Sequence, residues 1–288
     1  MKKVLIQLDT DPRPSAFDAL VAHDAGVDAL LSYGDVTPDV VQGLVQGAFF
    51  TRAPDDLSNL AVWVGGSNVP TGEEVLKAVQ EAFFGPFRVS VMLDSNGCNT
   101  TAAAMVARLA GATELSGKRT VVVGVGPVGL RAAALFEQEG CDVLAVTIPA
   151  DVLGAESYHR PRGLAVAEQM GLETLEASDR GEMEGALDGA HIVVASGPSG
   201  VQVLAHDTWS ALASAEMLAD CNAAEPLGLE GVEATDDLEE RDGKLVLGAL
   251  AIGGPKMKLH KGCVRRLFES KEEVLDFERI YAIASGQG

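Results

Sequence analysis

A glycine-rich turn near the middle of the chain constrains the fold more than any other feature of this sequence. The β-branched run TVVV (120–123) leads directly into GVGPVG (124–129), and a helical pattern then continues to about Gly140. A GxGxxG motif between a strand and a helix is typical of a turn that binds a dinucleotide, since its glycines permit the tight turn, the approach of a pyrophosphate and close helix packing. We therefore expect a helix N-terminus that attracts phosphate, with a cofactor bound by Gly124, Gly126, Pro127, Val128 and Gly129.

Short apolar runs alternate with longer amphipathic stretches along most of the chain. This alternation predicts an α/β fold with parallel sheets, and 288 residues favour two domains. Thr37 is expected to cap the helix over 39–49, with Pro38 at its first position, and Thr71 the helix over 71–83. A small-residue helix is expected from Asn99. The predicted strands cover 4–10, 60–66, 87–93, 120–126 and 142–148.

Further apolar runs lie at 191–197, 216–222 and 245–254, and a helix is expected over about 256–269, with another near the C-terminus. The segment 225–242 contains eight acidic residues, one arginine and no sustained apolar period. We expect it to form a surface loop or short edge elements.

The residue after the second strand of such a domain normally selects the cofactor. An acidic residue there binds the ribose of NAD, and an arginine nearby binds the 2′-phosphate of NADP. This chain has Thr147 at that point, in the stretch TIPAD (147–151), and Arg160 and Arg162 follow further on. The choice between NAD and NADP is therefore open. Two later strand ends are expected to border the nicotinamide and its ribose, although ordinary turn chemistry is the alternative. They are Ser196-Gly197-Pro198 and Asp220-Cys221-Asn222, of which Ser196, Gly197 and Asn222 are the expected cofactor-binding residues.

Charge and cysteine content exclude several classes of protein. The chain has 42 acidic residues against 22 lysines and arginines, a net charge of −20, which disfavours nucleic acid and anionic membranes. Its four cysteines form no CxxC pair, so we expect neither a metal site nor a disulfide framework. We see no signal peptide and no membrane-spanning stretch, and we expect a cytoplasmic protein.

Polar residues also follow the strands of the first part of the chain. They occur at 9–11, at 67–68 and in the run DSNGCNTT (94–101), which precedes a helix. Such a run near a domain junction is a candidate ligand site. The alternative is a helix-capping loop, because Asn99 and Thr100 are good capping residues.

Several blocks of the sequence resemble the bacterial NAD(P)-dependent methylene-tetrahydromethanopterin dehydrogenases. The resemblance implies a reversible hydride transfer from the methylene-bridged pterin to NAD or NADP, and some members also accept methylene-tetrahydrofolate. It implies a pterin-binding α/β domain over 1–115, a Rossmann domain over 116–250 and C-terminal helices over 251–288 that return to the first domain. A homo-oligomer is expected. The blocks are FDAL (17–20), SYGDVTPD (32–39), FFGPFRVSVMLDSNGCNTTAAA (83–104), VVGVGPVGLRAAAL (122–135), EPLGLEGVEATD (225–236) and GALAIGGPKMKLHKGCVRRLFES (248–270).

The resemblance places Lys256 in the pterin site, where it orients the substrate, and Asp94 is the nearest candidate counter-charge for the cation that forms. Carboxylate and amide groups can match the donors and acceptors of a pterin ring. Residues 255–266 carry five cations and no acid, which suits anionic ligands, although a solvated basic helix face is the alternative. The remaining expected substrate-binding residues are Asp11, Asn96, Asn99, Thr100 and His260.

Two features depart from the family pattern. Cys98 stands where serine is usual, and TIPAD replaces the Arg and Lys of NADP-preferring members, so relaxed cofactor specificity is expected. A folate dehydrogenase with cyclohydrolase activity is an alternative, but its usual Tyr-xxx-Lys pair is missing because Thr37 stands four residues after Tyr33. A non-catalytic dinucleotide sensor would have no reason to keep the two pterin-site blocks.

Overall fold

The computed structural model describes residues 1–154 and 160–287, and the chain divides into two compact units. Unit 1 comprises Met1–Thr100 and Met257–Gly288, and unit 2 comprises Thr101–Lys256. The bounds of the units therefore fall inside two helices, α4 (Cys98–Ala110) and α10 (Ala249–Arg266), and not at the expected residues 115 and 250.

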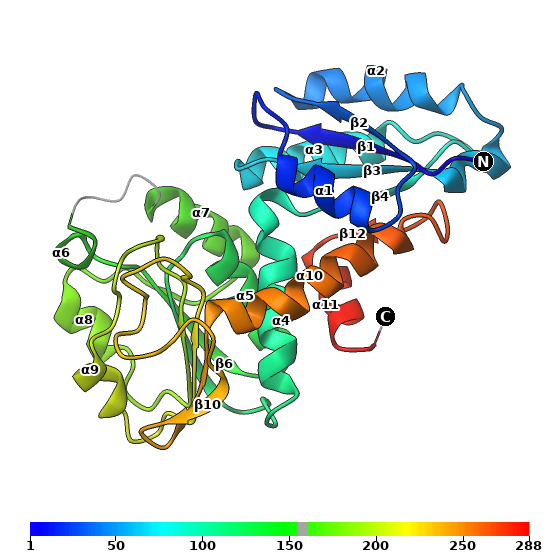
Figure 1. Cartoon of the computed structure of the whole chain (residues 1–288). Helices are drawn as coiled ribbons and strands as arrows, with labels where there is room; N and C mark the ends of the chain where they lie inside the picture. Colours follow the sequence, from blue (N-terminus) through cyan, green and yellow to red (C-terminus); the bar gives the residue numbers. More distant parts are fainter. Residues whose placement is uncertain (155–159, 288) are drawn as a thin grey trace. The chain divides into compact units, whose positions relative to one another are not determined.

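Unit 1 contains a five-stranded parallel sheet in the order β12-β4-β3-β1-β2. The helices α2 and α3 pack against each other on one face, and α1 covers the other face (Figure 1). The strands are β1 (Val4–Asp9), β2 (Ala29–Tyr33), β3 (Leu60–Gly65), β4 (Ser90–Leu93) and β12 (Val274–Leu275), and the other helices of the unit are α1 (Ala16–Asp24), α2 (Pro38–Phe49), α3 (Val69–Glu81), α11 (Phe277–Ala284) and the 3₁₀ turns Pro54–Asn59 and Ser95–Gly97.

Alternate residues of the unit 1 strands point to opposite faces of the sheet, and the buried side chains on the two faces differ in polarity. Ile6 and Leu8 of β1 and Val62 and Val64 of β3 belong to one apolar core with residues of α2 and α3. The alternate residues of these strands include Gln7 and Trp63, which are also buried. Trp63 contacts His260 of α10, so the opposite face of the sheet has a more polar interior.

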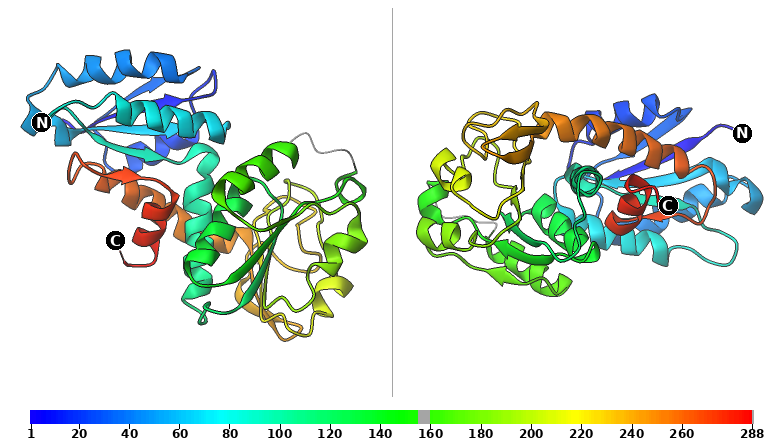
Figure 2. Two further views of the ribbon diagram at one scale, coloured as in Figure 1. Left: turned by 180° about the vertical axis from the view of Figure 1, so that it is seen from behind. Right: turned by 90° about the horizontal axis from the view of Figure 1, so that it is seen from below.

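Unit 2 contains a seven-stranded sheet in the order β10-β11-β9-β8-β5-β6-β7, parallel except for β10. The helices α5 and α7 contact each other on one face, and α8 and α9 lie on the other (Figure 2). The strands are β5 (Arg119–Val123), β6 (Asp142–Val146), β7 (Thr174–Leu175), β8 (Ile192–Ala195), β9 (Met217–Asp220), β10 (Asp237–Arg241) and β11 (Lys244–Leu247), and the helices are α5 (Pro127–Gln138), α6 (Ala150–Leu153), α7 (Arg160–Met170), α8 (Arg180–Gly185) and α9 (His206–Ser210).

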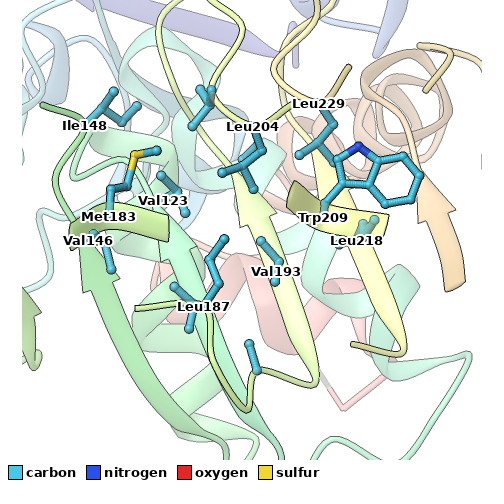
Figure 3. Close-up of a cluster of buried hydrophobic side chains, with 14 of the residues drawn as sticks. Val123, Val146, Ile148, Met183, Leu187, Val193, Leu204, Trp209, Leu218 and Leu229 are labelled. Atoms are coloured by element: carbon cyan, nitrogen blue, oxygen red, sulfur yellow. The ribbon is translucent and has the colours of Figure 1, made fainter. Parts of the chain in front are cut away.

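One buried apolar cluster joins this sheet to the helices on the α8 and α9 side (Figure 3). Val123, Val146 and Val193 come from adjacent strands, while Met183 and Trp209 come from the helices. A continuous apolar set from neighbouring strands is typical of a parallel sheet that is covered on both faces. The predicted α/β class is therefore confirmed.

Several predicted element boundaries need correction. Asn68, and not Thr71, caps α3, because its side chain accepts the N–H of Thr71 at 3.4 Å. Thr37 does cap α2 by position, but its hydroxyl donates to Asp39 and makes no cap hydrogen bond. The run 245–254 is not one element, since β11 ends at Leu247 and α10 already begins at Ala249 and ends at Arg266. The acidic segment 225–242 does contain an edge strand, β10.

None of the described helices is both long and apolar enough to cross a membrane.

Candidate cofactor and substrate sites

The glycines of GVGPVG meet different surroundings in unit 2. A Cβ at Gly124 would lie 2.5 Å from the carbonyl oxygen of Ser196, and φ there is +121°. A Cβ at Gly129 would collide with the carbonyl oxygen of Gly124 and with Oγ of Ser196. The fold itself therefore requires glycine at these two positions.

Gly126 differs from its neighbours because the described protein does not require a glycine there. Its backbone is extended, at φ −78° and ψ 174°, a conformation that any residue adopts. Chain neighbours and the helix's own backbone aside, no described heavy atom lies within 4 Å of a Cβ at this position. Gly126 also caps α5, with Pro127 at the first helical position, so free space adjoins the N-terminus of a helix. The residues present therefore fit a dinucleotide pyrophosphate.

Ser196 follows β8, directly beside the fingerprint loop. Its Oγ donates to the carbonyl oxygens of Gly124, at 3.0 Å, and Val123, at 3.3 Å. A Cβ at Gly197 would approach Val203 and Ile148, so this glycine is also required by packing. The strand order reverses between β5 and β8, and this switch point is where ligands bind in open α/β sheets.

Asn222 and Thr147 lie at strand ends as expected, but both are buried. Asn222 Nδ2 donates to the carbonyl oxygen of Pro226 at 3.1 Å, and its Oδ1 accepts the N–H of Ala224 at 3.0 Å. Thr147 Oγ1 accepts the N–H of Ala177 at 2.9 Å. These side chains hold loops in place, and their contact with a cofactor stays a prediction.

Asp220 is the first residue of the stretch 220–222 that was expected from the sequence to border the nicotinamide, and it ends β9. It is buried, and its carboxylate accepts the N–H groups of Asn222 at 2.8 Å and Leu229 at 2.9 Å. Burial raises the pKa of Asp220, although these backbone hydrogen bonds act in the opposite direction. The position of Asp220 at the end of an apolar run was visible in the sequence. The backbone N–H groups that its carboxylate accepts were not.

In unit 1 the strand order reverses between β1 and β3, so a second switch point lies at the ends of these strands. Asp11 accepts hydrogen bonds from the N–H of Ser67 at 2.9 Å and from its Oγ at 2.7 Å. Asp9 is buried and accepts the N–H groups of Asp11 and Ser15, both at 2.9 Å. The polar residues at 9–11 and 67–68 therefore do meet in space.

The loop after β4 folds around the carboxylate of Asp94. Asp94 Oδ1 accepts the N–H groups of Asn99 at 2.9 Å and Thr100 at 3.1 Å, and Oδ2 accepts the Thr100 hydroxyl at 2.6 Å. The start of α4 is thus held by Asp94, and not by Asn99 and Thr100, which were named as capping residues in the alternative interpretation of this loop. All three are buried, and Asn99 Nδ2 donates to the carbonyl oxygen of Leu93 at 2.6 Å. Their direct contact with a substrate stays a prediction.

Asn96 is the residue of this loop that faces solvent. It has φ +54°, a left-handed conformation that asparagine tolerates better than most residues. Asn96 is exposed next to the buried Ser95, whereas Cys98 is buried with Sγ 3.4 Å from Oδ1 of Asn99. The loop therefore presents one amide at the carboxyl edge of the sheet.

His260 and Lys256 lie one helical turn apart on α10 but differ in burial. His260 is fully buried, with Nε2 3.5 Å from Oδ2 of Asp94 and its ring 4.7 Å from that of Trp63. Lys256 is partly exposed and is the last residue of unit 2. Of the other cations, Lys261 pairs with Asp24 at 2.7 Å, while Lys258 and Arg265 are exposed.

The four cysteines are free thiols. Burial raises the pKa of Cys221 and of Cys263 to about 12, so both stay protonated near neutral pH. Among the described residues there is no group of three or more His, Cys, Asp or Glu that could hold a metal ion.

Comparison with known proteins links both units to characterised families. Residues 16–96 match the family model described as methylene-tetrahydromethanopterin dehydrogenase, N-terminal, and residues 112–228 match one described as putative NAD(P)-binding. The chain is 44% identical over 288 residues to the bifunctional protein MdtA of Methylorubrum extorquens. It is 30% identical over 301 residues to the NAD(P)-dependent methylenetetrahydromethanopterin dehydrogenase of the same organism. Each match covers 98% of both chains.

Two solved structures share the fold at low sequence identity. Shikimate dehydrogenase from Aquifex aeolicus has a TM-score of 0.52 at 15% identity, with 99% of this chain and 97% of that chain covered. The N5,N10-methylenetetrahydrofolate dehydrogenase-cyclohydrolase of Trypanosoma brucei has a TM-score of 0.52 at 14% identity, covering 93% and 86%. The Rossmann-type architecture expected from the fingerprint is thereby confirmed.

Proposed function

The chain belongs to the methylene-tetrahydromethanopterin dehydrogenase family, and from that membership we propose its reaction. It oxidises methylene-tetrahydromethanopterin reversibly to methenyl-tetrahydromethanopterin, with NAD(P) as the hydride acceptor. The observation that carries this function is the open space at Gly126, where the described protein leaves room that a side chain would fill. At the second glycine of a GxGxxG turn, such room allows the backbone to approach a pyrophosphate.

Unit 2 is the cofactor side of this proposal. Gly124 and Gly129 hold the turn, while Gly126, Pro127 and Val128 line the helix N-terminus where the diphosphate would bind. The bound nicotinamide would supply the hydride acceptor. Ser196 fixes the fingerprint loop from the neighbouring strand, and Asn222 fixes the loop after β9.

Unit 1 is the pterin side. The residues at its switch point offer groups that match the edge of a pterin ring, namely the carboxylate of Asp11 and the exposed amide of Asn96. Asp94, Asn99, Thr100 and His260 lie behind this surface and hold its shape. The oxidation needs little acid–base help, because the two nitrogens beside the methylene carbon stabilise the cation that forms. The task of the protein is then to orient the substrate and to exclude water.

Lys256 is assigned to orientation of the pterin. Its ammonium group is partly exposed on α10. As a cation near a forming cation it would act through hydrogen bonds and not through charge stabilisation. Asp94 would offset the positive charge of the cation that forms on the substrate. Its carboxylate is held in unit 1 by three hydrogen bonds from the loop after β4 and lies beside His260.

The cofactor is NAD(P), and relaxed choice between the two forms is part of the proposal. Thr147 is engaged with Ala177, and Asp151 accepts the N–H of Arg180 at 3.1 Å. Neither residue offers the cation that a 2′-phosphate requires. Arg162 is exposed in the first turn of α7. A Cβ at the next residue, Gly163, would collide with the carbonyl oxygen of Val125, so this turn packs closely against the fingerprint loop. Arg160, also considered from the sequence, has a side chain outside the described residues.

Methylene-tetrahydrofolate is the second candidate substrate, because the sequence resembles a family in which some members accept it. Added cyclohydrolase activity finds no support at Tyr33, which lies on the edge strand β2. The proposal also includes a cytoplasmic homo-oligomer without nucleic-acid, membrane or metal partners. The acidic composition supports the part of this proposal that concerns nucleic acid and anionic membranes.

Steady-state kinetics with the full chain tests this function. The absorbance of the reduced nicotinamide is followed with each of the two methylene-tetrahydropterins and each of NAD and NADP. We expect turnover with methylene-tetrahydromethanopterin and a lower kcat/KM with the folate. Turnover with neither pterin would overturn the proposed function, and a higher kcat/KM with the folate would reverse the choice of substrate.

A further inference from the structure

Three aromatic rings form a column from the interior of unit 1 to its surface. The ring of Trp63, on β3, packs edge-on against that of His260, on α10, with centroids 4.7 Å apart and planes at 66°. The centroid of the Phe17 ring, on α1, lies 6.3 Å from that of the His260 ring, with planes at 46°. Trp63 and His260 are fully buried, whereas Phe17 is 50% exposed. The column therefore ends in an aromatic ring that is open to solvent.

Polar contacts fix both ends of this column. The carboxylate of Asp94 lies 3.5 Å from Nε2 of His260 and is itself held by the backbone of the loop before α4. At the outer end, Ser15 caps α1 by accepting the N–H of Asp18, and the N–H of Ser15 donates to Asp9 at the end of β1. Because Phe17 is the second residue of α1, its backbone position is set by this link to the sheet.

The position of Phe17 is the one that a flat ligand of unit 1 would need. The start of α1 follows β1, and β1 borders the switch point where Asp11 and Ser67 are joined. An aromatic ring offers its face to a flat heterocycle, while neighbouring polar groups bind the edge of that heterocycle.

We propose that Phe17 is the stacking surface for the pteridine ring of the substrate. The inference rests on the proposed function, because it names the residue that would receive the ring of the same substrate. Asp11 and Asn96 would then bind the edge of the ring, and Phe17 would cover its face. The ring of Phe17 contacts that of His260, which in turn packs against the buried Trp63.

Phe17→Ala in the full chain is the central variant. Loss of the ring should raise the Kd for tetrahydromethanopterin and the KM for its methylene form about 10- to 100-fold, the range found when an aromatic that stacks a nucleic-acid base is removed. Affinity for NAD(P), measured by calorimetry, should stay near wild type. Phe17→Tyr keeps the ring and should bind the pterin nearly as well as wild type.

Two further variants separate stacking from structural effects. Leu20→Ala removes an apolar side chain of the same helix that is more exposed than Phe17, at 66% against 50%. This variant should leave the pterin affinity unchanged. Phe17→Leu retains apolar bulk over His260 but has no ring, so it should fold normally and still bind the pterin weakly. Wild-type pterin affinity in Phe17→Leu, or an equal loss in Leu20→Ala, would overturn the proposal. Failure of the wild-type chain to oxidise any methylene-pterin would instead refute the function itself.

Discussion

Asp11 accepts two hydrogen bonds from Ser67, one from the backbone N–H and one from the hydroxyl, and so joins the loop after β1 to the loop after β3. The two loops flank the switch point of the unit 1 sheet. The carboxylate that we assign to the substrate is therefore oriented before the substrate binds. Preorganisation of this kind lowers the cost of binding.

Ser67→Ala should remove the hydroxyl hydrogen bond and leave the backbone one. The expected result is a two- to tenfold increase of KM for the methylene-pterin, from a loss of about 0.5–1.5 kcal/mol. Affinity for NAD(P) and the melting temperature should change little, because Ser67 is exposed. Steady-state kinetics and calorimetry measure these quantities. An unchanged KM would show that the Asp11–Ser67 link does not orient a substrate group.

Gly126→Ala should leave the fold intact and weaken NAD(P) binding by about tenfold or more, because its methyl group occupies the place of the pyrophosphate. Gly129→Ala is the contrasting variant, since a Cβ there collides with the backbone of Gly124 and should lower the melting temperature. Thermal melts and calorimetric titration separate the two effects. Wild-type cofactor affinity in a folded Gly126→Ala protein would contradict the assigned site.

Cofactor choice should be relaxed, with kcat/KM for NAD and NADP within about a hundredfold, or roughly 3 kcal/mol in transition-state binding. The reason is that Thr147 and Asp151 are engaged within the protein and provide no cation. The alternative is that Arg162 binds the 2′-phosphate of NADP, and steady-state kinetics of Arg162→Ala with both cofactors tests it. Arg119→Ala is the control, because Arg119 lies at the opposite end of β5 from the fingerprint loop. A much larger preference for NADP that Arg162→Ala abolishes would show that α7 binds the 2′-phosphate.

Asp236 should make the stability of unit 2 depend on pH. Burial acts to raise the pKa of Asp236, but hydrogen bonds from Arg241, both at 2.6 Å, and from the N–H of Glu233 outweigh it and lower the pKa. A lowered pKa gives stability that is complete above the unfolded pKa of about 4 and is lost as the pH falls through the folded value. Asp236→Asn should cost about 1–3 kcal/mol at neutral pH.

Urea unfolding of wild type and Asp236→Asn at neutral and at acidic pH measures this effect. The difference in the free energy of unfolding should shrink once the pH falls below the folded pKa of Asp236. A difference that is equal at both pH values would mean that the ion pair with Arg241 does not contribute.

The features that local sequence determines were predictable. The glycine spacing of the fingerprint indicated a turn between β5 and α5, because Gly129 must pack directly on the backbone of Gly124. The polar run after β4 was also identified as a candidate site. Its internal arrangement was not, since the roles of Asp94 and Asn99 depend on which group accepts which backbone N–H.

Features that depend on distant contacts escaped prediction. Phe17 was seen only as part of a family block, because its ring column with His260 and Trp63 joins three elements that are far apart in sequence. The burial of His260 follows from α10 packing on the sheet of unit 1. The strand β12 contains two residues and exists only through its pairing with β4, so no periodicity in the sequence reveals it.

In the proposed reaction, a hydride passes directly from the methylene carbon of the pterin to the nicotinamide. Methylene-tetrahydromethanopterin with two deuterium atoms on the bridge carbon tests this direct transfer in ordinary water, with mass spectrometry of the reduced nicotinamide as the measurement. Direct transfer predicts one deuterium in each reduced cofactor molecule. Reduced cofactor without deuterium, or no reduction at all with either NAD or NADP, would contradict the claim.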